Sequence, residues 1–127
     1  MPKILATSAH FLVSDLVAAG RYYEEQLGFS IAEYWGDPPA FAMPRRDGII
    51  VMLNQVDRLP PRPNGTDDVW DAYFWCSNVE ELHEEYCRSS ADIVHGPVVR
   101  GQYNMLEMAV RDLDGYMLVF AERINAQ

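Results

Sequence analysis

The sequence contains little cysteine and few basic residues. Cys76 and Cys87 are its only two cysteines, and in a chain without an export signal we expect both thiols to be reduced and packed. The 10 Lys and Arg stand against 19 Asp and Glu, which gives a net charge of −9. Because no basic stripe is available to displace counterions from a phosphate backbone, nucleic acid is not expected as a partner.

Several sequence signals are also missing. No segment is long and apolar enough to span a bilayer, so no membrane partner is expected. The start, Met-Pro-Lys-Ile-Leu, lacks the cationic and apolar regions of an export signal, and a cytoplasmic location follows as the default expectation. The sequence has neither a Gly-x-Ser-x-Gly elbow nor a phosphate-binding glycine loop, which sets those two classes of enzyme aside.

The composition is that of a folded domain. The chain has 127 residues, of which 49% are hydrophobic and 12% aromatic. A chain of this size can bury most of the surface that its unfolded form exposes, so we expect one domain.

The stretch from residue 8 to residue 29 predicts a strand, a helix and a stop. Residues 8–13 carry apolar side chains on both faces, which suits a covered strand. Asp15 offers a helix cap, and Gly28 supplies a left-handed stop. Between them the apolar residues recur at helical spacing, at Leu16, Ala19, Tyr23 and Leu27.

The second half of the sequence repeats this pattern. Residues 71–79 align with residues 8–16, so that Phe74 matches Phe11 and Asn78 matches Asp15. An Asp-Gly hairpin signal precedes the last strand of each half, at residues 47–48 and 114–115. Each half therefore predicts a β-α-β-β-β module: residues 5–56, then a proline-rich connector at 57–69, then residues 70–123. The acidic residues of the second expected helix are interpreted as a solvated face: Glu80, Glu81, Glu84 and Glu85.

The order and duplication of these features resemble the vicinal oxygen chelate superfamily, which includes glyoxalase I, bleomycin-resistance proteins and extradiol dioxygenases. The matching stretches are residues 13–16, the helix end at 22–29 and the closing Arg-Asp-Leu-Asp-Gly at 111–115. The resemblance implies an α+β fold in which two βαβββ modules form a curled, cup-shaped mixed sheet with the helices outside. It also implies a homodimer.

The resemblance further implies where a metal would be held in the metal-dependent members. The four ligand places fall on Ser8, Met52, Asp71 and Val119. Methionine and valine offer no hard oxygen or imidazole nitrogen, so this sequence departs from the family's metal pattern. The chain therefore looks closest to the metal-less bleomycin-resistance-like members, and no cofactor is expected. A displaced metal site formed by His10, Asp71 and Glu107 is the alternative.

Alternation along the strands predicts which side chains face the cup. We expect a mixed aromatic and polar pocket, as is usual for small-molecule sites, and the alternative is that these large residues fill the cup as core. His10 and Asp71 favour a pocket, because a filled core seldom accepts two ionisable groups without partners. His83 and His95 are interpreted as a helix-surface and a strand-end residue. The predicted ligand-binding residues are His10, Trp35, Phe41, Met52, Asp71, Tyr73, Trp75, Glu107 and Val119.

Two functions from different classes are compatible with this pocket. The first is a metal-independent protein that binds or sequesters a small organic molecule, and the acidic balance would suit a cationic ligand. The second is an enzyme, either a glyoxalase-type lyase or isomerase or a dioxygenase. It would use a displaced metal site or metal-free acid-base chemistry, for which His10 is the best catalytic candidate. The sequence favours binding.

Overall fold

Each half of the chain begins with a strand and a capped helix. The computed structural model describes residues 1–66 and 68–125. In the first half, β1 (Ala9–Leu12) leads into α1 (Leu16–Glu25), whose cap Asp15 accepts a hydrogen bond from the amide of Ala18. In the second half, β6 (Ala72–Trp75) leads into α2 (Val79–Arg88), whose cap Asn78 accepts from the amide of Glu81. The two predicted helix starts are confirmed.

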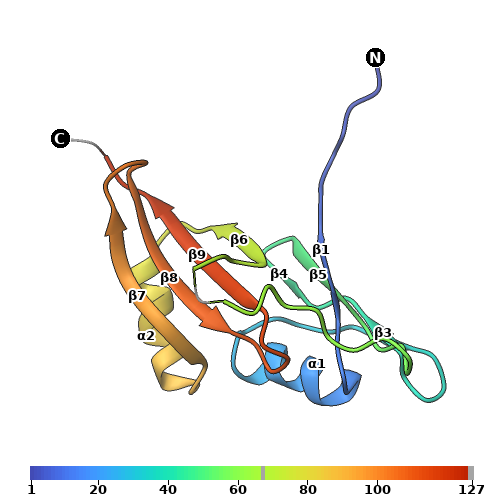
Figure 1. Cartoon of the computed structure of the whole chain (residues 1–127). Helices are drawn as coiled ribbons and strands as arrows, with labels where there is room; N and C mark the ends of the chain where they lie inside the picture. Colours follow the sequence, from blue (N-terminus) through green and yellow to red (C-terminus); the bar gives the residue numbers. More distant parts are fainter. Residues whose placement is uncertain (67, 126–127) are drawn as a thin grey trace.

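The strands form two sheets, which lie beside each other in Figure 1. The first sheet has the order β1-β5-β3-β2 with β4 added to β5, and the second has the order β6-β9-β8-β7. In both, the first strand of the half runs parallel to the last. The predicted α+β class is therefore confirmed. The other strands are β2 (Tyr34–Trp35), β3 (Phe41–Ala42), β4 (Arg45–Arg46), β5 (Ile49–Asn54), β7 (Asp92–Arg100), β8 (Met105–Arg111) and β9 (Met117–Arg123).

The middle strands of the first half are short. Of the stretch 30–35, only Tyr34–Trp35 is a strand, and Ser30 makes an isolated bridge with Arg45. Pro44 separates β3 from β4, because proline cannot donate the hydrogen bond that a continuous strand needs. The first sheet is therefore less regular than the second.

One hydrophobic core joins the two halves. It contains Phe11 and Tyr23 from the first half and Tyr86, Leu118 and Phe120 from the second, all 5% exposed or less. Because both helices contribute to it, the faces of the two sheets that carry these residues are turned toward each other. Strand alternation then turns the other faces, with His10 on β1 and Tyr73 on β6, away from the common core.

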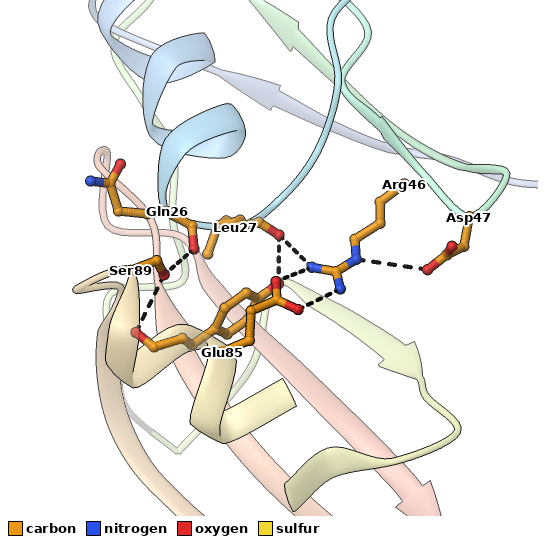
Figure 2. Close-up of polar contacts among 7 residues, drawn as sticks. Gln26, Leu27, Arg46, Asp47, Glu85 and Ser89 are labelled. Atoms are coloured by element: carbon orange, nitrogen blue, oxygen red, sulfur yellow. Dashed lines mark hydrogen bonds and ion pairs between the residues drawn. The ribbon is translucent and has the colours of Figure 1, made fainter. Parts of the chain in front are cut away.

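Polar contacts also link the halves, as Figure 2 shows for the turn after α1. The guanidinium of Arg46 donates two hydrogen bonds to the Glu85 carboxylate, at 2.7 and 2.9 Å, and one to the Leu27 carbonyl at 2.8 Å. The hydrogen bond from Arg46 lowers the pKa of Glu85. The interpretation of Glu85 as part of a solvated face was therefore incomplete: its side chain is 40% exposed, and it also bonds α2 to the first half.

Candidate functional site

A buried carboxylate lies at the centre of the outer face of the second sheet. Glu107 on β8 is 1% exposed, and its Oε2 accepts hydrogen bonds from the hydroxyls of Tyr73 at 2.7 Å and Tyr103 at 2.9 Å. Its Oε1 accepts from Nε of Arg100 at 3.3 Å. A buried carboxylate is costly unless it is paired, and these three donors offset that cost. We call these four residues the Glu107 cluster.

The two tyrosines of the cluster are held as donors. Burial, and then the hydrogen bond to Glu107, raise the pKa of Tyr73 well above its ordinary value. The same two causes raise the pKa of Tyr103. Both phenols therefore keep their protons at neutral pH, and the carboxylate acts as the acceptor of the network.

A cleft of about 410 Å³ opens beside this cluster. Arg100 and Tyr103 connect it to Glu107, and Val119 lies at its base, 1% exposed. His95 also lines the cleft from within β7, so its interpretation as a strand-end residue was wrong. The described residues that line it are Asp68, Trp70, His95, Arg100, Gln102, Tyr103 and Val119.

A row of aromatic rings begins at Trp70 in the cleft and continues along β6. The rings of Trp70 and Tyr73 have centroids 5.5 Å apart, and those of Tyr73 and Trp75 are 5.0 Å apart. Trp75 is 70% exposed and Trp70 is 39% exposed. Such rings present apolar faces that a flat organic molecule can stack on.

The predicted residues of the first half form a separate group. The His10 ring meets Phe41 edge-on with centroids 6.2 Å apart, and Phe41 lies 5.7 Å from Trp35. Met52 is the register partner of His10 on β5. His10 is exposed, and across the ranges 1–66 and 68–125 no hydrogen bond, ion pair or ring contact connects this group to the Glu107 cluster.

Asp71 has a different role from the one expected beside His10. Its carboxylate accepts hydrogen bonds from the backbone amides of Asn64 at 3.0 Å and Met117 at 2.8 Å. These bonds tie the connector to the start of β9. Both carboxylate oxygens are used in this way, so Asp71 stabilises the fold beside the cleft, and no hydrogen bond joins it to His10 in the described part of the chain.

The four places implied for a metal do not offer a ligand set. The Ser8 hydroxyl donates to the Ile50 carbonyl at 2.7 Å, and the Asp71 carboxylate is occupied by backbone amides. Met52 and Val119 carry no hard ligand atom. Among the described residues, no three His, Cys, Asp or Glu side chains are grouped as a metal ion would need, and the residues present do not fit a divalent metal.

Sequence reasoning missed five residues that line this cleft: Asp68, His95, Arg100, Gln102 and Tyr103. The signal that would have found Arg100 and Tyr103 is the hairpin between β7 and β8, in which Val98 faces Glu107 and Arg100 faces Met105. A turn at residues 101–104 brings side chains from both strands to the same face. His95 is displaced by the register shifts on both sides of it, which alternation from sequence cannot locate.

Known proteins share this architecture. The family model described as Glyoxalase/Bleomycin resistance protein/Dioxygenase superfamily matches residues 6–120. A glyoxalase/bleomycin resistance protein/dioxygenase from Nocardioides is similar in structure, with TM-score 0.74 and 17% identity over 100% of this chain and 88% of that one. TioX from Micromonospora sp. ML1 is similar with TM-score 0.73 and 19% identity, over 92% of this chain and 97% of TioX.

A virulence protein from Salmonella typhimurium is also similar, with TM-score 0.70 and 21% identity, over 98% of this chain and 100% of that one. No curated protein matches this chain. At these identities the solved structures show the fold alone, and the family model covers most of the sequence. The chain belongs to the Glyoxalase/Bleomycin resistance protein/Dioxygenase superfamily.

Proposed function

We propose that this chain binds a small, partly aromatic organic molecule on the outer face of its second sheet, without a metal. The observation that carries the proposal is the Glu107 cluster beside the 410 Å³ cleft. The exposed rings of Trp70 and Trp75 supply stacking surface. The exposed part of the Arg100 side chain supplies polar contacts. This combination of apolar surface with a few fixed polar groups is typical of small-molecule sites.

Binding is favoured over acid-base catalysis by the state of the carboxylate. Glu107 is 1% exposed, and three protein donors already occupy most of the roughly four acceptor positions of its two oxygens. A general base must come within hydrogen-bond reach of the proton that it removes. His10 is the remaining candidate for the enzymatic alternative, and it stands among the aromatic residues of the first half.

Trp70→Ala should weaken ligand binding about tenfold, because one stacking contact is lost together with its buried area. We would titrate the protein with a panel of aromatic amines, phenols and carboxylates and follow backbone amide shifts by ¹H–¹⁵N NMR. Shifts should concentrate on β6, β8 and β9. The same titration after dialysis against EDTA should give the same Kd.

Val17→Ala is the matched control, because Val17 is exposed on α1, away from the cleft. Its titration should be unchanged. Shifts centred on α1, or no saturable shift with any class of the panel, would contradict the proposed site. Binding that disappears with EDTA and returns with a divalent metal would contradict metal independence.

We also propose that the protein is a homodimer whose cup is completed by two chains. Residues 5–56 and 70–123 would be its modules, joined by the connector 57–69. The common core supports this arrangement, because the His10 face and the Tyr73 face both point away from it, and Tyr73 packs against a separate, smaller cluster of buried residues on its own sheet. In a twofold dimer, the His10 group of one copy would close over the Glu107 cluster of the other.

Light scattering at micromolar concentration should therefore give about twice the 14.5 kDa of one chain. The mass should not change when EDTA is added, because no metal bridges the copies. A mass of one chain over the whole concentration range would refute the dimer.

A further inference from the structure

The first seven residues form an arm whose apolar side chains are exposed. Residues 1–7 are all exposed, and they continue from β1 as an extended segment that leaves the body of the molecule (Figure 1). Ile4 is 96% exposed and Leu5 is 91% exposed. Two large aliphatic side chains side by side in water are an unpartnered apolar surface.

A second uncovered apolar surface lies at the free edge of β6. A cleft of about 500 Å³ runs there between the turn joining β4 to β5 and the start of α2. Phe74, Leu82 and Phe120 lie along it, and the exposed side chains of Ile49 and Trp75 stand at its rim. This cleft shares no lining residue with the smaller cleft, and its nearest link to the Glu107 cluster is Trp75, whose ring lies 5.0 Å from that of Tyr73.

The charges of this cleft favour a cationic partner. Asp47 and Glu81 stand at its rim, and both are exposed. Among the described residues that line it, the one cation is Arg46, which bonds both oxygens of Glu85 and pairs with Asp47 at 3.7 Å, as Figure 2 shows. The carboxylates of Asp47, Glu81 and Glu85 stand against this one guanidinium, so the net charge of the lining is negative.

The edge of β6 also offers a backbone partner. In the second sheet β6 is bonded on one side to β9 and is the outermost strand on the other. An extended peptide that lies along such an edge can add a strand, with its side chains in the adjoining pockets.

We propose that the arm of a second copy docks in this cleft, with Ile4 and Leu5 against Phe74 and Trp75 and with Lys3 facing Asp47 and Glu81. Lys3 is the first charged residue of the chain, and the next is Asp15. The whole chain has a net charge of −9. Because the arm carries the positive charge of Lys3, it is attracted to an acidic rim. Seven extended residues span roughly 23 Å, which is enough to cross from one copy to another. The contact requires the self-association of the proposed homodimer and adds a specific attachment to it.

A native thiol makes the contact testable, because Cys76 lines the cleft. We would introduce Ile4→Cys together with Cys87→Ser, so that Cys76 is the only native thiol. This variant would then be oxidised with glutathione disulfide at micromolar protein concentration. The expected result is a covalent dimer on a non-reducing gel. The dimer should be lost when Cys76→Ser is added, and also when Ile4→Cys is replaced by Arg58→Cys on the exposed connector.

A non-covalent measurement avoids reliance on the thiols. Ile4→Asp with Leu5→Asp should raise the dimer dissociation constant at least tenfold in analytical ultracentrifugation, while Val17→Asp, another exposed apolar position, should leave it unchanged. A dimer that forms normally with both arm substitutions, and that gives no cross-link through Cys76, overturns the arm contact and leaves the proposed homodimer standing. A cross-link that joins Ile4→Cys to Cys76 within one chain overturns it as well. If the cross-link forms but no compound of the NMR panel binds at the Glu107 cluster, the proposed ligand site is contradicted and the arm contact is not.

Discussion

Phe11→Ala should lower the free energy of unfolding by about 3–5 kcal/mol, the usual loss when a buried phenylalanine is truncated. Phe11 is 5% exposed, and its ring stacks on Tyr116 with centroids 4.2 Å apart. Tyr116 belongs to the second half, and its hydroxyl donates to the Leu12 carbonyl at 2.7 Å. The substitution therefore leaves a cavity at the point where the two halves pack together.

His10→Ala is the matched control, because His10 directly precedes Phe11 on β1 and its side chain is exposed on the opposite face. It should change the free energy of unfolding by about 0.5 kcal/mol or less. Urea unfolding of both variants, followed by far-UV circular dichroism and by tryptophan fluorescence, would measure the two effects. A loss below about 1 kcal/mol for Phe11→Ala would show that the halves do not depend on this contact.

The parts of the fold that sequence predicted are those that short-range chemistry determines. Asp15 and Asn78 cap their helices in the structure through their side chains, and a capping residue followed by a helical stripe is contained within a few residues. The duplication of the pattern then indicated two equivalent halves, and the two parallel pairs, β1 with β5 and β6 with β9, have matching places in the topology.

Contacts between distant residues could not be predicted in this way. Glu85 follows the same acidic pattern as its neighbours on α2, yet Arg46, far from it in sequence, forms two hydrogen bonds with it. Helical spacing says which face a side chain occupies, and it does not say what another element brings to that face. The short strands β2, β3 and β4 depart from the pattern for a related reason, since prolines and turn residues interrupt their pairing.

The candidate site likewise contains one part that the sequence predicted and one part that it did not. Alternation placed Tyr73 and Glu107 on one face, and the structure joins them by a hydrogen bond of 2.7 Å. The placing of His10 and Asp71 together in one pocket was an inference about two ionisable groups at related strands. The structure shows that backbone amides use the Asp71 carboxylate instead, a local arrangement that residue type alone does not reveal.

Asp112 should make the stability of this protein depend on pH in the opposite sense to most carboxylates. Burial raises the pKa of Asp112 to about 6 from an ordinary 3.8, although hydrogen bonds from Tyr23 and from the backbone amides of Tyr116 and Asp114 oppose the rise. Between these two values the folded chain binds more protons than the unfolded chain. The contribution of Asp112 to stability is therefore fully present below about pH 4 and is lost as pH rises through about 6.

The size of this effect is about 3 kcal/mol, since each unit of difference between folded and unfolded pKa corresponds to about 1.4 kcal/mol. Asp112→Asn removes the titration and keeps an oxygen that accepts from the two backbone amides. Urea unfolding of both proteins between about pH 4 and about pH 7 would measure the effect as the difference between their free energies of unfolding. The contributions of Glu85 and all other titrating groups cancel in that difference. The variant should gain stability relative to the natural chain as pH rises, and a ¹³C NMR titration of the Asp112 carboxyl should show its midpoint near 6. A constant difference between the two proteins, or a midpoint at or below the ordinary value, would show that the hydrogen bonds from Tyr23 and the two amides outweigh the burial of the carboxylate.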